Sequence, residues 1–220
     1  MTDMNFDQAR FNMIEQQIRP WDVLDESVLD AMAIVPREDY APTEYSNLAF
    51  TDMNIPLGDD EVMMAPKLEA RMLQALAIEP TDTVLEVGTG SGYVTALLAE
   101  LARHVYSVDI NPAFSEAARK KLMDHEVINA TLEVGDAAQG WDRHGPYDVI
   151  AITGSLPMLP AGFEQSLKVG GRLFAIVGDA PVMEATLVTR MSQTEFQREM
   201  VFETVLPPLK NAMQPNRFSF

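Results

Sequence analysis

The chain has 220 residues and a formal net charge of −17 at pH 7, which arises from 33 acidic and 16 basic side chains. A surface this acidic repels phosphate backbones and offers no polybasic patch, so nucleic acid and anionic membranes are not expected as partners. The chain contains no cysteine, which excludes disulfides, thiolate nucleophiles and cysteine-ligated zinc.

The first residues lack the basic and apolar regions of a signal peptide. No apolar run approaches the roughly 20 residues that span a bilayer. We therefore expect a soluble, cytoplasmic protein. Its length suits one domain over 1–220, with an N-terminal helical extension and lid loop in 1–80 and an α/β core in 81–220.

Hydrophobic periodicity predicts three helices before residue 80, at 5–19, 26–34 and 66–77. Arg19-Pro20 should end the first helix, because a residue before proline avoids the α region. Asp25 should cap the second helix, and Pro66 suits the first turn of the third. The polar stretches 36–42 and 55–61 are interpreted as loops.

From residue 83 onward, predicted strands and helices alternate. The strands are Thr83–Val87, Val105–Asp109, Ala130–Val134, Tyr147–Thr153 and Gly171–Val177, and the helices are Ser91–Arg103, Pro112–His125 and Leu159–Leu167. This alternation implies right-handed crossovers and a parallel sheet. Two further strands, Glu184–Met191 and Glu199–Val205, are joined by a short polar link and predict an antiparallel hairpin at the sheet edge.

The main functional signal is the glycine-rich turn Gly88-x-Gly90-x-Gly92 between a predicted strand and a helix. Glycines let a ligand approach the backbone, and the helix N-terminus offers unpaired N–H groups. Asp109 ends the next strand 17 positions after Gly92, near the roughly 20 at which such an acid reaches ribose hydroxyls. The spacing is not the G-x-G-x-x-G of a dinucleotide site. Together with Glu86, it resembles the first motif of S-adenosylmethionine-dependent methyltransferases.

Several stretches together resemble the protein-L-isoaspartate O-methyltransferase family. They lie at 13–18, 28–32, 35–38, 55–58, 85–93, 135–136, 140–141 and 147–150. The resemblance implies a Rossmann-like methyltransferase fold with a seven-stranded, mostly parallel sheet, an antiparallel C-terminal hairpin and an N-terminal helical extension. It also implies methyl transfer from S-adenosylmethionine to isoaspartyl carboxylates in damaged proteins, so that a protein or peptide is the substrate.

The same resemblance implies a set of cofactor-binding residues in this chain: Glu86, Gly88, Thr89, Gly90, Ser91, Gly92, Asp109, Ile110, Asp136, Ala137 and Thr153. Glu86 and the glycines would line the methionine end of the cofactor, and Asp109 would hold the ribose hydroxyls. Asp136, with the Ala137 N–H, would meet the adenine ring. Asp136 has a second interpretation as an aspartate that forms a turn after a strand.

The chain departs from the family at Glu61-Val62-Met63-Met64, where the family has a Gln-Thr-Ile-Ser-like sequence with a hydroxyl facing the reacting centre. Met64 stands in place of that hydroxyl. The acids at 59–61 either repel an acceptor carboxylate or form a solvated loop tip. Met63, Met64 and Ser155 are expected to contact substrate. No catalytic residue is assigned, although Ser155, whose hydroxyl could also stabilise a turn, and Asp60 are considered.

A carboxylate acceptor is ionised at pH 7 and needs no general base, whereas a phenol would favour a base or a metal. No metal site is predicted, and the three histidines lie outside the expected substrate segments, at His104, His125 and His144. Two alternatives stay open: a diverged paralogue that methylates another small acceptor, and a cofactor-binding protein that has lost catalysis. The first would use a methionine-lined pocket made of Met53, Met63, Met64 and Met72. The oligomeric state is not predicted.

Overall fold

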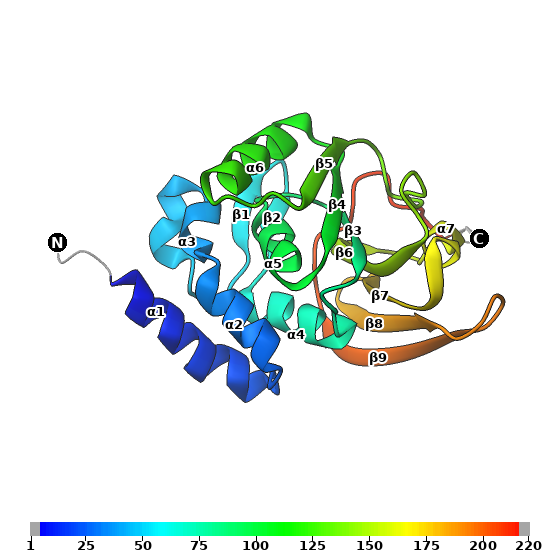
Figure 1. The fold of residues 1–220 in the computed structure, drawn as a ribbon, viewed down its shortest axis with the longest axis horizontal. Helices are drawn as coiled ribbons and strands as arrows, with labels where there is room; N and C mark the ends of the chain where they lie inside the picture. The colour runs from blue at the N-terminus through cyan, green and yellow to red at the C-terminus, as the bar shows by residue number, and fades with distance from the viewer. Residues whose placement is uncertain (1–4, 216–220) are drawn as a thin grey trace.

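A computed structural model describes residues 5–215. Within them, a seven-stranded sheet has the strand order β5-β4-β3-β6-β7-β8-β9 (Figure 1). Its strands are β3 (Thr83–Val87), β4 (His104–Asp109), β5 (Ala130–Val134), β6 (Tyr147–Leu156), β7 (Leu167–Asp179), β8 (Val182–Arg190) and β9 (Phe196–Thr204). The pairs among β3 to β7 are parallel, and β8 and β9 add antiparallel strands at the edge. The predicted α/β fold with its C-terminal hairpin is confirmed.

The strand order reverses at β3. The chain places β4 and β5 on one side of β3 and then crosses to place β6 and β7 on the other. Parallel pairing brings the carboxyl end of β3, at Val87, beside Val108 of β4 and Ile152 of β6. In open α/β sheets, ligands bind at the carboxyl ends of the strands where the order reverses. The topology therefore predicts a ligand site at the carboxyl end of β3.

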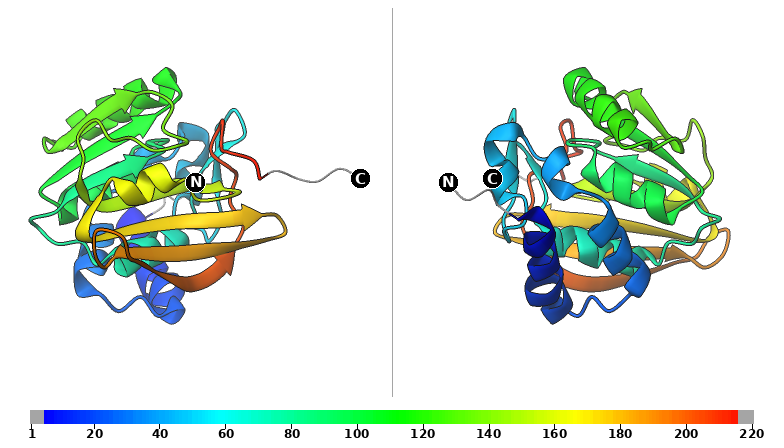
Figure 2. Two further views of the ribbon diagram at one scale, coloured as in Figure 1. Left: turned by 90° about the vertical axis from the view of Figure 1, so that its right-hand side faces the viewer. Right: turned by 60° about the vertical axis from the view of Figure 1, so that its left-hand side comes forward.

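Alternating side chains divide the hydrophobic core between the two faces of the sheet. Val84 and Val149 belong to the larger cluster, whereas their neighbours Leu85 and Ile150 belong to the second. Helices α4 (Pro66–Leu76), α5 (Tyr93–Leu101) and α6 (Pro112–Asp124) cover the first face, and the short α7 (Ala161–Gln165) lies on the other (Figure 2). The helix predicted at Leu159–Leu167 is therefore shorter than expected, because Leu167 already starts β7.

The N-terminal extension packs outside α4 and α5. It contains α1 (Phe6–Met13), the π-helix η1 (Ile14–Ile18), the 3-10 helices η2 (Arg19–Trp21) and η3 (Thr43–Leu48), α2 (Glu26–Ile34) and α3 (Arg37–Tyr40). The expected stop at Arg19-Pro20 is wrong, since the chain stays helical through Trp21 and turns at Asp22, where φ is 59°. Proline is tolerated at the start of the 3-10 turn because its missing N–H is not needed there. Asp25 caps α2 as predicted, accepting from the Ser27 N–H at 2.9 Å.

The interpretation of 36–42 as a polar loop is wrong. The segment forms α3, and both Arg37 and Tyr40 are fully buried. The Arg37 guanidinium forms an ion pair with the buried Glu69 carboxylate of α4. It also donates hydrogen bonds of 2.6 Å to the backbone carbonyls of Ala49 and Met64. Composition alone made this segment look solvated, because every partner of Arg37 is distant in sequence.

The interpretation of 55–61 as a loop is also wrong. The strands β1 (Ile55–Gly58) and β2 (Glu61–Met63) pair into an antiparallel hairpin. Asp59 and Asp60 form its two-residue turn with φ of 54° and 64°. Left-handed φ at both central residues matches the twist of the flanking strands, and aspartate tolerates that conformation better than most residues.

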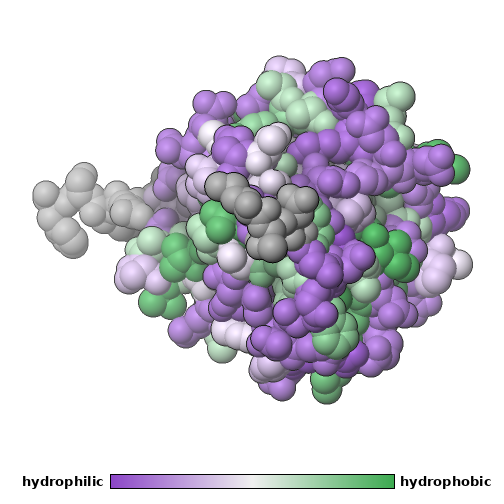
Figure 3. All heavy atoms as spheres, turned by 90° about the vertical axis from the view of Figure 1, so that its left-hand side faces the viewer, coloured by the Kyte–Doolittle hydropathy of each residue, from purple (hydrophilic) through white to green (hydrophobic). Residues whose placement is uncertain are grey.

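The extension and the sheet share one hydrophobic cluster, which holds Met13 and Met32 from the extension as well as Val84 and Phe174 from strands. This shared cluster supports the proposal that 1–80 and 81–220 form a single domain. Figure 3 shows the face that carries α1 and α3, where hydrophilic residues predominate and hydrophobic residues form small separate patches. None of the helices within residues 5–215 is both long and apolar enough to cross a bilayer.

Replacing Arg37 with methionine is expected to lower the free energy of unfolding by about 3–5 kcal/mol, because the substitution leaves the Glu69 carboxylate buried without its partner. The double variant Arg37→Met/Glu69→Leu should recover part of that loss. Urea unfolding of the three proteins measures both effects. A double variant no more stable than Arg37→Met would show that the unpaired charge is not the cause.

Candidate functional site

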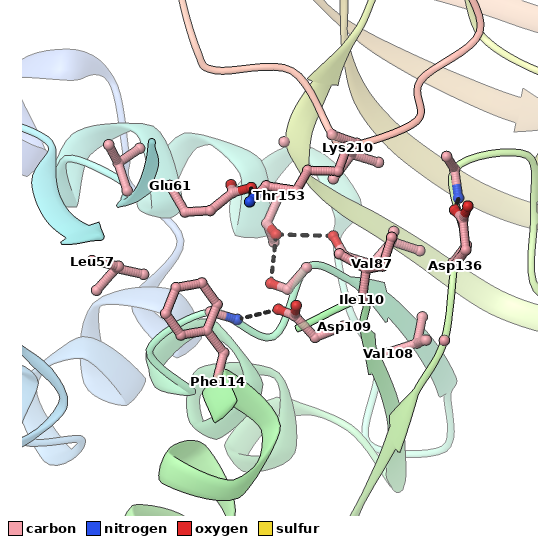
Figure 4. Close-up of a pocket in the computed structure, with 18 residues that line it drawn as sticks. Leu57, Glu61, Val87, Val108, Asp109, Ile110, Phe114, Asp136, Thr153 and Lys210 are labelled. Carbon is pink, nitrogen blue, oxygen red and sulfur yellow. Dashed lines mark hydrogen bonds and ion pairs between the residues drawn. The ribbon is translucent and has the colours of Figure 1, made fainter. Parts of the chain in front are cut away.

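A cavity opens at the carboxyl ends of the central strands (Figure 4). Seven residues predicted to bind cofactor line it: Gly88, Gly90, Asp109, Ile110, Asp136, Ala137 and Thr153. The glycine turn after β3 forms its floor, the ends of β4, β5 and β6 form its sides, and the β1–β2 hairpin and a C-terminal segment complete the wall. We call residues 206–212 the C-terminal strap.

The floor of the cavity requires glycine at position 88. Its φ is 101°, and a Cβ there would lie 2.3 Å from the Thr153 hydroxyl oxygen. That hydroxyl is held against the carbonyl oxygens of Val87, at 2.9 Å, and Gly88, at 2.7 Å. A side chain at position 88 would therefore displace the Thr153 hydroxyl from these carbonyls, and it would also have to adopt a left-handed φ.

Asp109 is fixed at the end of β4, with 8% of its surface exposed to the cavity. One carboxylate oxygen accepts from the Gly90 N–H at 2.9 Å, and the other accepts from the Asn111 N–H at 2.8 Å. A carboxylate has about four acceptor positions. The side chain is therefore oriented by the backbone and still able to accept hydrogen bonds from two neighbouring hydroxyl groups.

Asp136 follows β5 on the other side of the cavity. Its Oδ1 accepts from the Ala138 N–H at 3.0 Å, so the turn-forming interpretation applies, and its Oδ2 accepts from the Asn211 side-chain amide at 2.9 Å. The side chains of Ile110 and Phe114 add apolar surface to the same cavity. An oriented carboxylate at the end of β4, next to apolar side chains and a second carboxylate, suits a nucleoside.

The other predicted cofactor residues do not line the cavity. Glu86 lies fully buried beneath the turn and accepts from the Thr95 hydroxyl at 2.5 Å. Thr89 shares a 2.6 Å hydrogen bond with Ser107, the Ser91 hydroxyl accepts from the Tyr93 N–H at 3.3 Å, and Gly92 precedes α5 with φ of 85°. These residues shape the turn, and a direct role in binding stays a prediction.

The residues predicted on the acceptor side lie elsewhere. Met63 and Met64 are each 3% exposed and belong to the large core cluster. Ser155 is buried at 1% exposure, and its hydroxyl donates to the Leu206 carbonyl at 2.8 Å. Asp60 is exposed at the hairpin turn, as is Met53 in the segment before β1. None of these residues lines the cavity, and their contact with substrate stays a prediction.

The structure adds cavity residues that the sequence did not indicate, notably Leu57, Phe114, Gly154, Leu209 and Lys210. Glu61 was noted only as one of three loop acids, and it is the one that lines the cavity. The Glu61 Oε1 lies 3.8 Å from the Lys210 Nζ. Burial raises the pKa of Glu61, while Lys210 opposes the rise. Only the two consecutive prolines before Leu209 hint in the sequence at an extended segment that could cross a site.

The three histidines lie outside the cavity, each beside a polar side chain. The His104 Nε2 is 3.0 Å from the Thr131 hydroxyl, the His125 Nε2 is 3.2 Å from Asp39, and the His144 Nε2 is 3.2 Å from Glu133. Within residues 5–215, no group of three or more acidic or histidine side chains is arranged to hold a metal ion.

The reversed strand order, the antiparallel edge and the cavity at the end of β3 define the Rossmann-like fold of methyltransferases. Residues 8–214 match the sequence model of the protein-L-isoaspartate(D-aspartate) O-methyltransferase family, and the chain belongs to this family.

Two relatives illustrate the similarity. The protein-L-isoaspartate O-methyltransferase of Syntrophus aciditrophicus is 36% identical over 188 residues, which cover 86% of each chain. That of Rhodopseudomonas palustris is 36% identical over 201 residues, which cover 91% of this chain and 92% of the relative.

Solved structures show the same fold. A Plasmodium falciparum protein described as a putative protein-L-isoaspartate O-methyltransferase, in complex with S-adenosyl-L-homocysteine, superposes with a TM-score of 0.80 at 17% identity, covering 94% of this chain and 99% of that one. A second protein-L-isoaspartate O-methyltransferase gives a TM-score of 0.78 at 21% identity, covering 94% of this chain and 67% of that one.

Burial raises the pKa of Glu86 to about 8, although hydrogen bonds from Ser107 and Thr95 oppose the rise. A raised folded-state pKa contributes stability that is complete below the unfolded value of about 4.5 and is lost as the pH rises through about 8. Glu86→Gln removes this dependence. We expect the variant to gain stability relative to the wild type, on the order of 3–4 kcal/mol, between pH 5 and pH 8.

Urea unfolding at the two pH values measures this gain. Glu100→Gln is the matched control, because Glu100 is exposed on α5 and its substitution makes the same chemical change. A stability difference between Glu86→Gln and the wild type that does not change with pH would show that Glu86 is already ionised in the folded protein at pH 5.

Proposed function

We propose that the protein transfers a methyl group from S-adenosylmethionine to the free carboxylate of isoaspartyl residues in proteins or peptides. The observation that carries the proposal is the Asp109 carboxylate, held by the Gly90 and Asn111 N–H groups in the side wall of a glycine-floored cavity. Membership of the isoaspartate methyltransferase family supplies the acceptor.

The residues present suit the cofactor chemically. Asp109 can accept from two ribose hydroxyls, while Ile110, Phe114 and Ala137 offer apolar surface to an adenine ring. Asp136 and the Ala137 N–H would offer polar partners to the amino group and ring nitrogens of that adenine. When bound, S-adenosylmethionine supplies an electrophilic methyl group on its sulfonium. The three carboxylates that line the cavity favour a cationic ligand.

The chain's own contribution to the reaction is alignment and exclusion of water. A carboxylate acceptor is ionised at neutral pH, so no residue has to remove a proton. Positioning of two reactants can lower a barrier by roughly 7–11 kcal/mol. The hairpin side chains Leu57 and Val62, with Leu209 of the C-terminal strap, provide the apolar wall on the open side.

We propose further that Met64 replaces the family's active-site hydroxyl and that isoaspartyl turnover is slow as a result. Losing one hydrogen bond to a charged group costs roughly 1.5–3 kcal/mol. Of the three acids at 59–61, Glu61 alone lines the cavity, so it is the group that opposes an acceptor carboxylate. This carboxylate is also the observation that favours the second candidate function, methylation of an acceptor that is not anionic.

The substrate class, the lack of nucleic-acid binding and the location are also proposed. A protein or peptide is the proposed substrate, on the strength of the family, and the net charge of −17 supports a chain that does not bind nucleic acid. The expectation of a cytoplasmic location stays a proposal.

Asp109→Ala should weaken binding of S-adenosylhomocysteine by about 10- to 100-fold, because two hydroxyl groups lose a charged acceptor. Calorimetry measures the dissociation constants. Asp124→Ala, at an exposed position near the end of α6, makes the same substitution outside the cavity and should have no effect. Tighter binding of NAD than of S-adenosylhomocysteine by the wild type would contradict the cofactor assignment.

The proposed activity is tested with labelled S-adenosylmethionine and a peptide that contains one isoaspartyl residue. We expect base-labile methyl ester to form on this peptide and not on the matched aspartyl peptide, with Glu61→Gln raising the rate several-fold because repulsion of the acceptor is removed. Transfer to an amine or hydroxyl acceptor with none to the isoaspartyl peptide would establish the second function instead. Cofactor binding without any transfer would identify the chain as a cofactor-binding protein.

A further inference from the structure

Lys210 differs in charge from the other ionisable residues of the cavity. Of the described side chains that line it, Glu61, Asp109 and Asp136 are acidic and Lys210 alone is basic. Asp109 and Asp136 are tied to neighbouring N–H groups, whereas Lys210 faces Glu61 on the hairpin. Figure 4 shows Lys210 and Glu61 together on one side of the cavity and Asp109 on the other. Thr153 lies between this pair and Asp109.

The C-terminal strap fixes the backbone on both sides of Lys210. The Leu209 N–H donates to the Ser155 carbonyl at 2.9 Å, and the Ser155 N–H donates to the Pro207 carbonyl at 2.9 Å. The Asn211 side chain donates to Asp136 at 2.9 Å. Leu209 also packs so closely on the end of β6 that a Cβ on Gly154 would lie 2.6 Å from its Cδ2. The backbone position of Lys210 is therefore fixed by the contacts of the strap with β6 and Asp136.

The contact between Lys210 and Glu61 is loose. The 3.8 Å between Nζ and Oε1 exceeds hydrogen-bond range, and the side chains are 43% and 29% exposed. Exposed ion pairs of this kind contribute little to stability. An incoming carboxylate that makes a direct hydrogen bond to the ammonium group can replace Glu61 at small cost, and that bond is charge-assisted.

We propose that Lys210 binds the carboxylate of the methyl acceptor, with Glu61 as its counter-ion when no acceptor is present. The inference rests on the proposed function and deepens it by naming the residue that selects an anionic acceptor. Met64 is buried in the core and offers no polar group. Lys210 is therefore the cation available in the cavity lining to offset repulsion of the acceptor by Glu61, Asp109 and Asp136. A methyl ester carries no charge, and the attraction that holds the acceptor disappears in the product.

The test measures peptide binding directly. Calorimetry in the presence of S-adenosylhomocysteine compares an isoaspartyl peptide with the same peptide carrying isoasparagine, whose amide is neutral. The wild type should prefer the carboxylate. Lys210→Gln should weaken carboxylate binding about tenfold and leave amide binding unchanged, Lys210→Arg should keep most of the preference, and Glu61→Gln should strengthen carboxylate binding several-fold.

The matched control is Lys168→Gln. Lys168 is ion-paired with Asp148 at 2.7 Å and its side chain is 41% exposed, close to the exposure of Lys210, but it lies outside the cavity. Its substitution should not change the preference for carboxylate over amide. Binding of S-adenosylhomocysteine alone is measured in every variant, so that each peptide titration is run with the cofactor site saturated. In Lys168→Gln this binding should stay within about twofold of the wild type.

The outcomes separate this inference from the proposed function. If the wild type methylates the isoaspartyl peptide and Lys210→Gln keeps the full preference for carboxylate, the role of Lys210 is overturned and the function stands. If Glu61→Gln binds the carboxylate peptide as the wild type does, the role of Glu61 as counter-ion to Lys210 is overturned while the function stands. This result does not depend on whether Lys210→Gln folds. If the wild type binds S-adenosylhomocysteine but neither binds nor methylates the isoaspartyl peptide, the proposed function fails, and the inference fails with it.

Discussion

The arrangement of the N-terminal half depends on one buried guanidinium. Arg37 pairs with Glu69 of α4, holds the backbone carbonyls of Ala49 and Met64, and lies 4.7 Å from the centre of the Tyr93 ring of α5. Removing a charge from water is costly, and a buried pair offsets that cost only when its remaining polar groups are satisfied. The Arg37 guanidinium has partners from four segments, although the Glu69 Oε1 has no hydrogen-bond partner among the described residues. The segment just after the hairpin is thereby fixed relative to the sheet, and the hairpin side chains reach the cavity as a consequence.

The two walls of the cavity are formed by different elements of the fold. Its inner wall belongs to the sheet, where parallel strands end together and the glycine turn, Asp109 and Thr153 meet through hydrogen bonds between strand ends. Its outer wall comes from the hairpin and the C-terminal strap, which lie far apart in sequence and face each other through Glu61 and Lys210. The inner wall suits the proposed cofactor. The outer wall carries Glu61 and Lys210, the two residues proposed to act on the acceptor.

The sequence predicted those features that depend on local pattern. Strands with alternating or continuous apolar residues, the Asp25 cap and the strand-end position of Asp109 follow from nearest neighbours and from spacing along the chain. It failed at 36–42 and 55–61, because the burial of Arg37 and the pairing of β1 with β2 depend on residues distant in sequence. Glu86 is a third case. Its position in the motif correctly predicts the turn, but the sequence does not show that its side chain is fully buried and lies outside the cavity. Lys210 reaches the cavity only because the strap crosses the end of β6.

The C-terminal strap has a further consequence for access. Its hydrogen bonds to Ser155 and Asp136 are separate from the pairing of the central strands, so they can break while the ladder between β3, β4 and β6 stays intact. Local openings of this kind require far less free energy than global unfolding and occur on microsecond-to-second timescales. A ligand enclosed by the strap would then exchange at a rate set by this small segment rather than by the stability of the domain.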